Sequence, residues 1–418
     1  MLFCSFLDPL YFFTYTFLKQ RVLIVTEEIP SEDLDRMLSR AARSFMIFIK
    51  PSGSLCNLHC SYCYYLEKKE LYPDMESFRM PEALLEEYII QHINASPEKT
   101  VRFSWHGGEP TVLGLDFFRM AVSLQKKHRP AGYHIANGMQ TNGTLLDENW
   151  GRFLAKEGFY VGLSLDGPKE FHDIHRRTKK GKSSFEKTMH GYEILKKHGV
   201  SRDILCVVHN DNVKYPERVY HFFKDIEASY ITFLPLVERS PETERGISER
   251  TVPSEAWGEF LCTVFDEWVS RDIGWIKVQI FEEAARTAFG QEHSLCIFRP
   301  TCGDVPVIEH NGDFYSCDHF VDPGHRLGNI QKTPLVELLE SPAQRAFGLA
   351  KLKTLPRACL ECDVREMCNG GCPKNRFLKT ADGEENLNYL CSGYKSFFQH
   401  CRPWVEEVGV QWRKTKND

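Results

Sequence analysis

Short runs of apolar, β-branched or aromatic residues alternate with amphipathic segments along most of the chain. The runs predict six strands, over residues 46–50, 101–105, 133–137, 159–165, 204–209 and 230–234. Between them a 3.6-residue period predicts helices, over 81–94, 115–128, 147–157, 184–198 and 216–227. This alternation indicates an α/β fold built of parallel βαβ units with right-handed crossovers, in an open sheet or a barrel.

The pattern changes twice after the last predicted strand. Residues 238–253 are charged and contain Pro, Gly and Ser, so they predict a linker or surface loop, followed by an amphipathic helix over 254–271. Eight cysteines then lie between Cys296 and Cys391. We therefore expect five parts: an extension 1–45, an α/β unit 46–237, a linker and helix 238–295, a cysteine-rich domain 296–395 and a tail 396–418.

The N-terminal extension is apolar and aromatic but has no basic segment and no small-residue cleavage site, so it does not predict a signal peptide. Asp8 and Pro9 interrupt the apolar run that a transmembrane helix would need. We expect residues 1–45 to be poorly ordered, or translation to begin at Met46. We expect no stable association with a membrane. The alternative is that the apolar extension contains a short membrane-associating segment.

Composition narrows the class of protein. The chain has 418 residues, 42% of them hydrophobic, and a net charge of −5 from 52 basic and 57 acidic residues, which argues against a nucleic-acid partner. Its 15 cysteines are too sparse for a disulfide scaffold, and a chain of this length can bury a core without one. The cysteines therefore require another explanation.

Cys56, Cys60 and Cys63 form a C-x3-C-x2-C motif just after the first predicted strand. Three thiolates on one loop can hold three corners of an iron–sulfur cube, and the missing fourth ligand leaves one iron open to a small molecule. Zinc is the alternative, but a structural zinc site needs four ligands. His59 is the nearest candidate, and its place between two of the cysteines makes chelation of the same ion awkward.

The second group of cysteines has enough ligands for two closed sites of four. Its members are Cys296, Cys302, Cys317, Cys359, Cys362, Cys368, Cys372 and Cys391. The spacing alone does not assign their pairing, and two zinc ribbons are the alternative to two clusters. Of the remaining cysteines, Cys4, Cys206, Cys262 and Cys401, we expect Cys206 and Cys262 to be buried apolar residues.

The segment 305–318 carries a candidate proton acceptor. Asn311-Gly312 between apolar runs predicts a type I′ hairpin, with Cys317 and Asp318 adjacent on the outgoing strand. Successive side chains of a strand point to opposite faces, so a cluster ligand at Cys317 would direct Asp318 away from the cluster, toward the mouth of the sheet. The alternative is a surface aspartate beside a ligand.

The motif CNLHCSYC resembles the signature of the radical S-adenosylmethionine (SAM) superfamily, with Tyr62 in the aromatic position. The resemblance implies a [4Fe–4S] cluster that binds SAM and a partial (β/α)6 barrel. It also implies SAM contacts from Gly107, Gly108 and Glu109 in a GGEP motif, Ser164 at the end of strand four, Arg176, and the apolar Val237 near the adenine. These positions follow strands, where parallel α/β folds place their sites.

The later cysteines and the string CNGGCP (368–373) resemble the SPASM extension of this superfamily, which carries two auxiliary [4Fe–4S] clusters. The resemblance implies one cluster on Cys296, Cys302, Cys317 and Cys372. It implies the other on Cys359, Cys362, Cys368 and Cys391. The expected cofactors are therefore three [4Fe–4S] clusters and SAM.

The strings CDHFVDP (317–323) and CNGGCPKNR (368–376) closely resemble anaerobic sulfatase-maturating enzymes, from about Met46 to Cys401. The implied function is oxidation of a Cys or Ser of an unfolded or nascent sulfatase polypeptide to Cα-formylglycine. A 5′-deoxyadenosyl radical would take the hydrogen, Asp318 would remove the proton, and a small electron donor such as flavodoxin or ferredoxin would supply the electron.

Two other functions are considered. One is a SPASM peptide maturase that forms a thioether or another crosslink, against which the two strings argue. The other is a non-catalytic zinc-binding interaction protein. Reduced thiolates and oxygen-sensitive clusters imply a cytoplasmic location.

Overall fold

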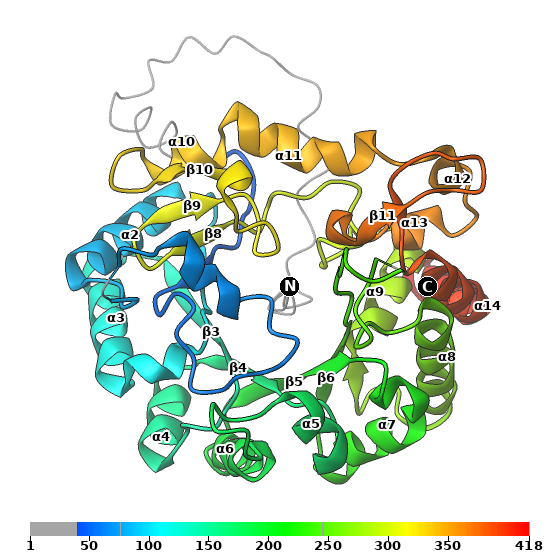
Figure 1. Ribbon diagram of the computed structural model, residues 1–418, viewed down its shortest axis with the longest axis horizontal. Helices are drawn as coiled ribbons and strands as arrows, with labels where there is room; N and C mark the ends of the chain where they lie inside the picture. The colour runs from blue at the N-terminus through cyan, green and yellow to red at the C-terminus, as the bar shows by residue number, and fades with distance from the viewer. Residues whose placement is uncertain (1–39, 76, 245, 418) are drawn as a thin grey trace.

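Seven parallel strands form a curved sheet whose outer face is covered by helices, and the segment after the first strand lies across its open centre (Figure 1). The computed structural model describes residues 40–75, 77–244 and 246–417. The strands are β1 (Phe48–Lys50), β2 (Thr100–Trp105), β3 (His134–Thr141), β4 (Tyr160–Ser164), β5 (Ser201–Val208), β6 (Tyr230–Pro235) and β7 (Lys277–Val278). They pair in sequence order, which confirms the predicted βαβ organisation and gives the partial barrel.

Helices connect successive strands. Those of the barrel are α2 (Glu82–Ala95), α3 (Leu115–His128), α4 (Glu148–Lys156), α5 (Lys169–His175), α6 (Phe185–Lys197), α7 (Pro216–Asp225) and α8 (Ser254–Arg271). Trp105 and Trp257 are fully buried in the two apolar clusters that these helices form with the sheet. No helix in the described ranges is long and apolar enough to cross a membrane.

The sheet continues into the cysteine-rich part of the chain. β8 (Val307–Glu309) pairs in parallel with β1, and β9 (Asp313–Tyr315) and β10 (Arg326–Asn329) follow as antiparallel neighbours. The turn between β8 and β9 is not the predicted type I′, because Asn311 does not have a positive φ. Instead Gly312, at φ +86°, ends a three-residue loop and donates its N–H to the Glu309 carbonyl.

Further helices and a hairpin complete the C-terminal part. The elements are α9 (Gln279–Ala288), α10 (Leu335–Leu339), α11 (Pro342–Lys353), α12 (Arg357–Leu360), α13 (Arg365–Cys368), β11 (Arg376–Leu378), β12 (Leu387–Asn388) and α14 (Cys391–Asn417). The segment predicted as a tail belongs to α14, which packs against α8 and α9 (Figure 1). Its Phe397, Phe398 and Cys401 are fully buried there.

Candidate active site

A cavity of about 260 Å³ opens at the carboxyl ends of the parallel strands. Its wall contains the cysteine loop after β1, the ends of β2 to β6, and segments that follow β9 and α13. It brings together most of the predicted site residues: Cys56, Cys60, Tyr62, Cys63, Gly107, Gly108, Glu109, Ser164, Arg176 and Asp318. Val237 does not line the cavity. It is buried in the core, and Leu236 faces the cavity in its place.

The three thiols of the first motif lie on a loop held by backbone contacts. Leu58 donates its N–H to Cys56 Sγ at 3.3 Å, and Cys63 N–H bonds the Cys60 carbonyl at 3.1 Å. Burial raises the pKa of Cys56 and Cys60 to about 12, and the charge of Glu109 adds to the rise for Cys56. Such thiols ionise where a cation or cluster replaces the lost hydration, so the donor set fits an iron–sulfur cluster with one open iron.

The glycines of the GGEP motif allow the end of β2 to pack against this loop. A Cβ on Gly108 would lie 2.4 Å from the Leu55 carbonyl oxygen, and one on Gly107, at φ +142°, 2.4 Å from Ser52 Oγ. Gly108 N–H also bonds the Gly53 carbonyl at 2.7 Å. Glycine is therefore required here because the end of β2 approaches the chain's own cysteine loop so closely.

Glu109 joins two strand ends. Its carboxylate accepts hydrogen bonds from Thr141 Oγ1 and from the backbone N–H of Asn142, both at 2.7 Å. Burial raises the pKa of Glu109, although these hydrogen bonds oppose the rise. This side chain thus fixes the β3 end against the β2 end, at the wall where the sequence predicted a SAM contact.

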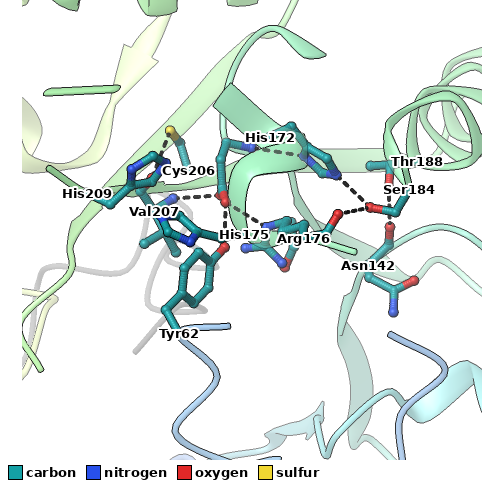
Figure 2. Close-up of polar contacts among 12 residues, drawn as sticks. Tyr62, Asn142, His172, His175, Arg176, Ser184, Thr188, Cys206, Val207 and His209 are labelled. Atoms are coloured by element: carbon teal, nitrogen blue, oxygen red, sulfur yellow. Dashed lines mark hydrogen bonds and ion pairs between the residues drawn. The ribbon is translucent and has the colours of Figure 1, made fainter. Parts of the chain in front are cut away.

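Arg176 and Tyr62 converge on one buried carboxylate (Figure 2). Asp166 Oδ2 accepts from Arg176 Nε at 2.9 Å and from the Tyr62 hydroxyl, while Oδ1 accepts from the Val207 N–H at 3.0 Å. Asp166 is fully buried and was not predicted as a site residue. Its position two residues after Ser164, in the string LSLDGP, is the signal that could have identified it.

Asp318 lies in the cavity wall with two polar partners. Lys50 Nζ is 2.6 Å from Oδ1, and the Tyr64 hydroxyl donates to Oδ2 at 2.5 Å. Burial opposes ionisation, but the positive charges nearby, that of Lys50 foremost, together outweigh it and hold the pKa of Asp318 well below its usual range. Both Cys317 and Asp318 follow β9 rather than lying on it, so the predicted strand position was wrong although the direction of Asp318 was right.

Lys50 and Tyr64 were not predicted from the sequence. Lys50 ends β1 and is 2% exposed, and its ammonium group also lies 4.2 Å from the centre of the Tyr65 ring. A lysine that interrupts a buried apolar strand just before the cysteine loop is the signal that was missed. The cavity also contains His319 and Lys374 beside these groups.

The later cysteines form two groups in space. Burial and then the charges of Cys372 and Cys296 raise the pKa of Cys317, and the same two thiols act on Cys302. A second set lies together in the same way. Burial and then the charges of Cys391, Cys359 and Cys362 raise the pKa of Cys368. The structure therefore brings the eight thiols together in the two sets of four implied by the resemblance. Cys206 is buried as expected, Cys262 is half-buried, and Cys4 lies outside the described residues.

Comparison with known families defines the class. The radical SAM superfamily matches residues 51–223, and an iron–sulfur cluster-binding domain named SPASM matches residues 301–363. Together with the three-cysteine site, these matches make the chain a radical SAM protein with a SPASM extension. SuiB of Streptococcus suis shares the fold, with a TM-score of 0.60 at 17% identity.

More similar relatives identify the family. A serine-type anaerobic sulfatase-maturating enzyme of Bacteroides thetaiotaomicron is 45% identical over 87% of this chain and 91% of its own. A cysteine-type enzyme of Clostridium perfringens is 34% identical over 87% and 97%. The solved structure of native anSMEcpe with bound AdoMet and Cp18Cys peptide has a TM-score of 0.80 and 33% identity, covering 88% of this chain and 99% of that one. The chain belongs to the family of anaerobic sulfatase-maturating enzymes.

Proposed function

We propose that this protein oxidises a cysteine or serine of a sulfatase polypeptide to Cα-formylglycine. The observation that carries the proposal is one cavity that contains both the three-cysteine motif and the ionised carboxylate of Asp318. The names of the relatives support it, since both serine-type and cysteine-type sulfatase-maturating enzymes match most of the chain.

The cofactors are assigned to residues that face the cavity or gather beside it. Cys56, Cys60 and Cys63 would hold the cluster that binds SAM, and Ser164, Arg176 and Leu236 would line the SAM site. The sets that contain Cys317 and Cys368 would hold the auxiliary clusters. When bound, SAM at its cluster supplies the abstraction of a hydrogen atom from the substrate Cβ.

Asp318 would accept the proton of the substrate thiol or hydroxyl. Lys50 keeps the carboxylate ionised, and the hydrogen bond from Tyr64 fixes its orientation toward the cavity. Its side chain is 6% exposed, so water has little access to the reacting groups. Iron–sulfur clusters need a reducing compartment, for which reason we place the protein in the cytoplasm.

The test is mass spectrometry of sulfatase-derived peptides that carry the target Cys or Ser, incubated anaerobically with the reconstituted protein, SAM and dithionite. Replacing the side chain by an aldehyde should lower the mass by about 18 Da for Cys or about 2 Da for Ser. SAM cleavage without either loss would contradict the proposal. A crosslinked peptide would indicate a peptide maturase instead.

A further inference from the structure

The loop between α5 and α6 is strongly basic. Arg177, Lys179, Lys180 and Lys182 are all exposed in this segment, residues 177–183, which we call the basic loop. Within the described chain none of the four takes part in an ion pair, and Arg177 donates only to the carbonyls of Asp173 and Gly181. Two acidic side chains of the flanking helices are already engaged: Asp173 accepts hydrogen bonds from Ser183 and Ser184, and Glu186 pairs with Lys169.

The basic loop is joined directly to the cysteine loop. Thr178 forms an antiparallel bridge with Leu58, which lies between Cys56 and Cys60. His59 donates its N–H to the Arg177 carbonyl at 2.7 Å, and its side chain is exposed. The basic loop therefore lies directly against the segment between Cys56 and Cys60, two of the three thiols proposed to hold the SAM-binding cluster.

This side is distinct from the substrate cavity. Leu58, Cys56 and Cys60 line the cavity, but no residue of the basic loop does. One face of the cysteine loop thus adjoins the cavity and the other adjoins the basic loop. A protein bound at the basic loop would leave the cavity open to a peptide.

Local charge of this kind selects an acidic partner. The whole chain carries a net charge of −5, so the attraction of an acidic protein would depend on local positive charge such as that of this loop. Unpaired exposed lysines are strongly hydrated, and their main effect is on the rate of encounter rather than on affinity.

We propose that the basic loop is the docking surface for a small acidic electron-transfer protein that reduces the SAM-binding cluster. The proposal rests on the function proposed above. One electron passes in the docked complex, so the carrier is oxidised by one electron and the cluster is reduced by one. No proton or bond change at the loop is needed.

The test compares two reductants on the cluster-loaded full chain, with reduced flavodoxin as the protein donor and dithionite as the small one. In the variant Lys179→Glu/Lys180→Glu/Lys182→Glu, the second-order rate of cluster reduction by flavodoxin at low salt should fall about tenfold or more. Reduction by dithionite should be unchanged. The wild-type rate with flavodoxin should also fall as salt rises, since screening shortens the reach of the charges.

The matched control is Lys332→Glu/Lys353→Glu/Lys414→Glu, which makes the same change in net charge at three exposed lysines elsewhere. It should keep the wild-type rate with flavodoxin. Equal rates in the two triple variants, or a wild-type rate that salt does not change, would overturn the proposal. The proposal would also be overturned if the basic-loop variant lost binding to anionic lipid vesicles but kept the wild-type rate of reduction by flavodoxin. Failure of the proposed function has a different signature, namely no formylglycine even with dithionite.

Discussion

Asp318 illustrates how one neighbouring charge sets the chemistry of a residue. A carboxylate buried this deeply would be neutral without a partner, and a neutral acid cannot accept a proton. Lys50 supplies the partner at 2.6 Å, and both side chains are nearly inaccessible to water. Because the pair is buried, removing either member leaves an uncompensated charge, which is costly. The base and its counterion therefore act as a unit.

Asp318→Asn should retain SAM cleavage and lose formylglycine formation by a factor of about 100 or more, the usual contribution of a positioned base. The measurement is 5′-deoxyadenosine and modified peptide from the same reaction. Asp322→Asn is the control. Asp322 is close to Asp318 in the sequence, but its side chain is partly exposed, pairs with His325 and does not line the cavity. Wild-type product yield from Asp318→Asn would remove this carboxylate from the mechanism.

Among single residues, the sequence identified the groups that would react or hold clusters, but it did not identify the side chains that pair with them. The cysteines and Asp318 were found because spacing and motif mark them. Lys50 and Asp166 were missed because their importance depends on contacts with residues far along the chain, Asp318 and Tyr62. Val237 lies in the core, and the end of β6 contributes Leu234, Pro235 and Leu236 to the cavity wall instead.

Among the elements, the end of β2 and the cysteine loop depend on each other. The Cβ of an alanine at 108 would overlap the carbonyl oxygens of Leu55 and Ser54, and backbone cannot yield as a side chain can. Any relief must displace the loop that carries Cys56.

Gly108→Ala should therefore lose the SAM-binding cluster, about four of about twelve irons, while the far-UV circular dichroism stays near wild type. Iron analysis and EPR of the reconstituted protein give the answer. Gly324→Ala is the control, since its added Cβ would meet only the flexible Asp322 carboxylate. A full complement of iron in Gly108→Ala would show that the loop tolerates the contact.

Helix α2 contains a buried histidine that is expected to make the stability of the fold depend on pH. His92 is buried against Tyr88 and Phe103, and burial lowers its pKa to about 3. The unfolded chain takes up this proton near pH 6.5 and the folded protein does not, so stability is full above that pH and falls as pH decreases toward 3.

His92→Gln should reduce the loss of unfolding free energy between pH 7.5 and pH 5 by about 2 kcal/mol. The measurement is urea unfolding of the reconstituted protein at both pH values. His134→Gln, at an exposed position on β3, should behave as wild type. An unchanged pH dependence in His92→Gln would mean that other groups cause the acid sensitivity.

The regular elements were the most predictable part of the fold. Helix α3 matches its predicted bounds, and every predicted strand has its counterpart within a few residues, because each carries a clear period. Helix α5 was missed because it has only seven residues. Helix α14 was taken for a tail because Pro403 interrupts its pattern and because its burial depends on contacts with α8 and α9.

In the whole molecule, one continuous sheet joins the barrel to the part of the chain that carries the later cysteines. The sheet runs without interruption from β10 to β7, so the part that carries the later cysteines is attached to the barrel at β1. This continuity places Asp318 over the cavity while Cys317 lies with Cys296 and Cys372. No sequence pattern shows which strand will pair with β1, because that pairing is set by packing across more than 250 residues.

The three, four and four thiols predict about twelve irons per chain after anaerobic reconstitution. Elemental analysis should find iron in this amount and little zinc. Colourless protein with about three zinc ions would instead support a non-catalytic zinc-binding protein.

The central claim is that this cavity removes hydrogen from the Cβ of the target residue. The most direct measurement uses a sulfatase peptide deuterated at that Cβ, with SAM and dithionite, and locates the deuterium by mass spectrometry. We expect deuterium in 5′-deoxyadenosine together with an aldehyde in the peptide. Deuterium that stays in an unmodified peptide while SAM is cleaved would contradict it.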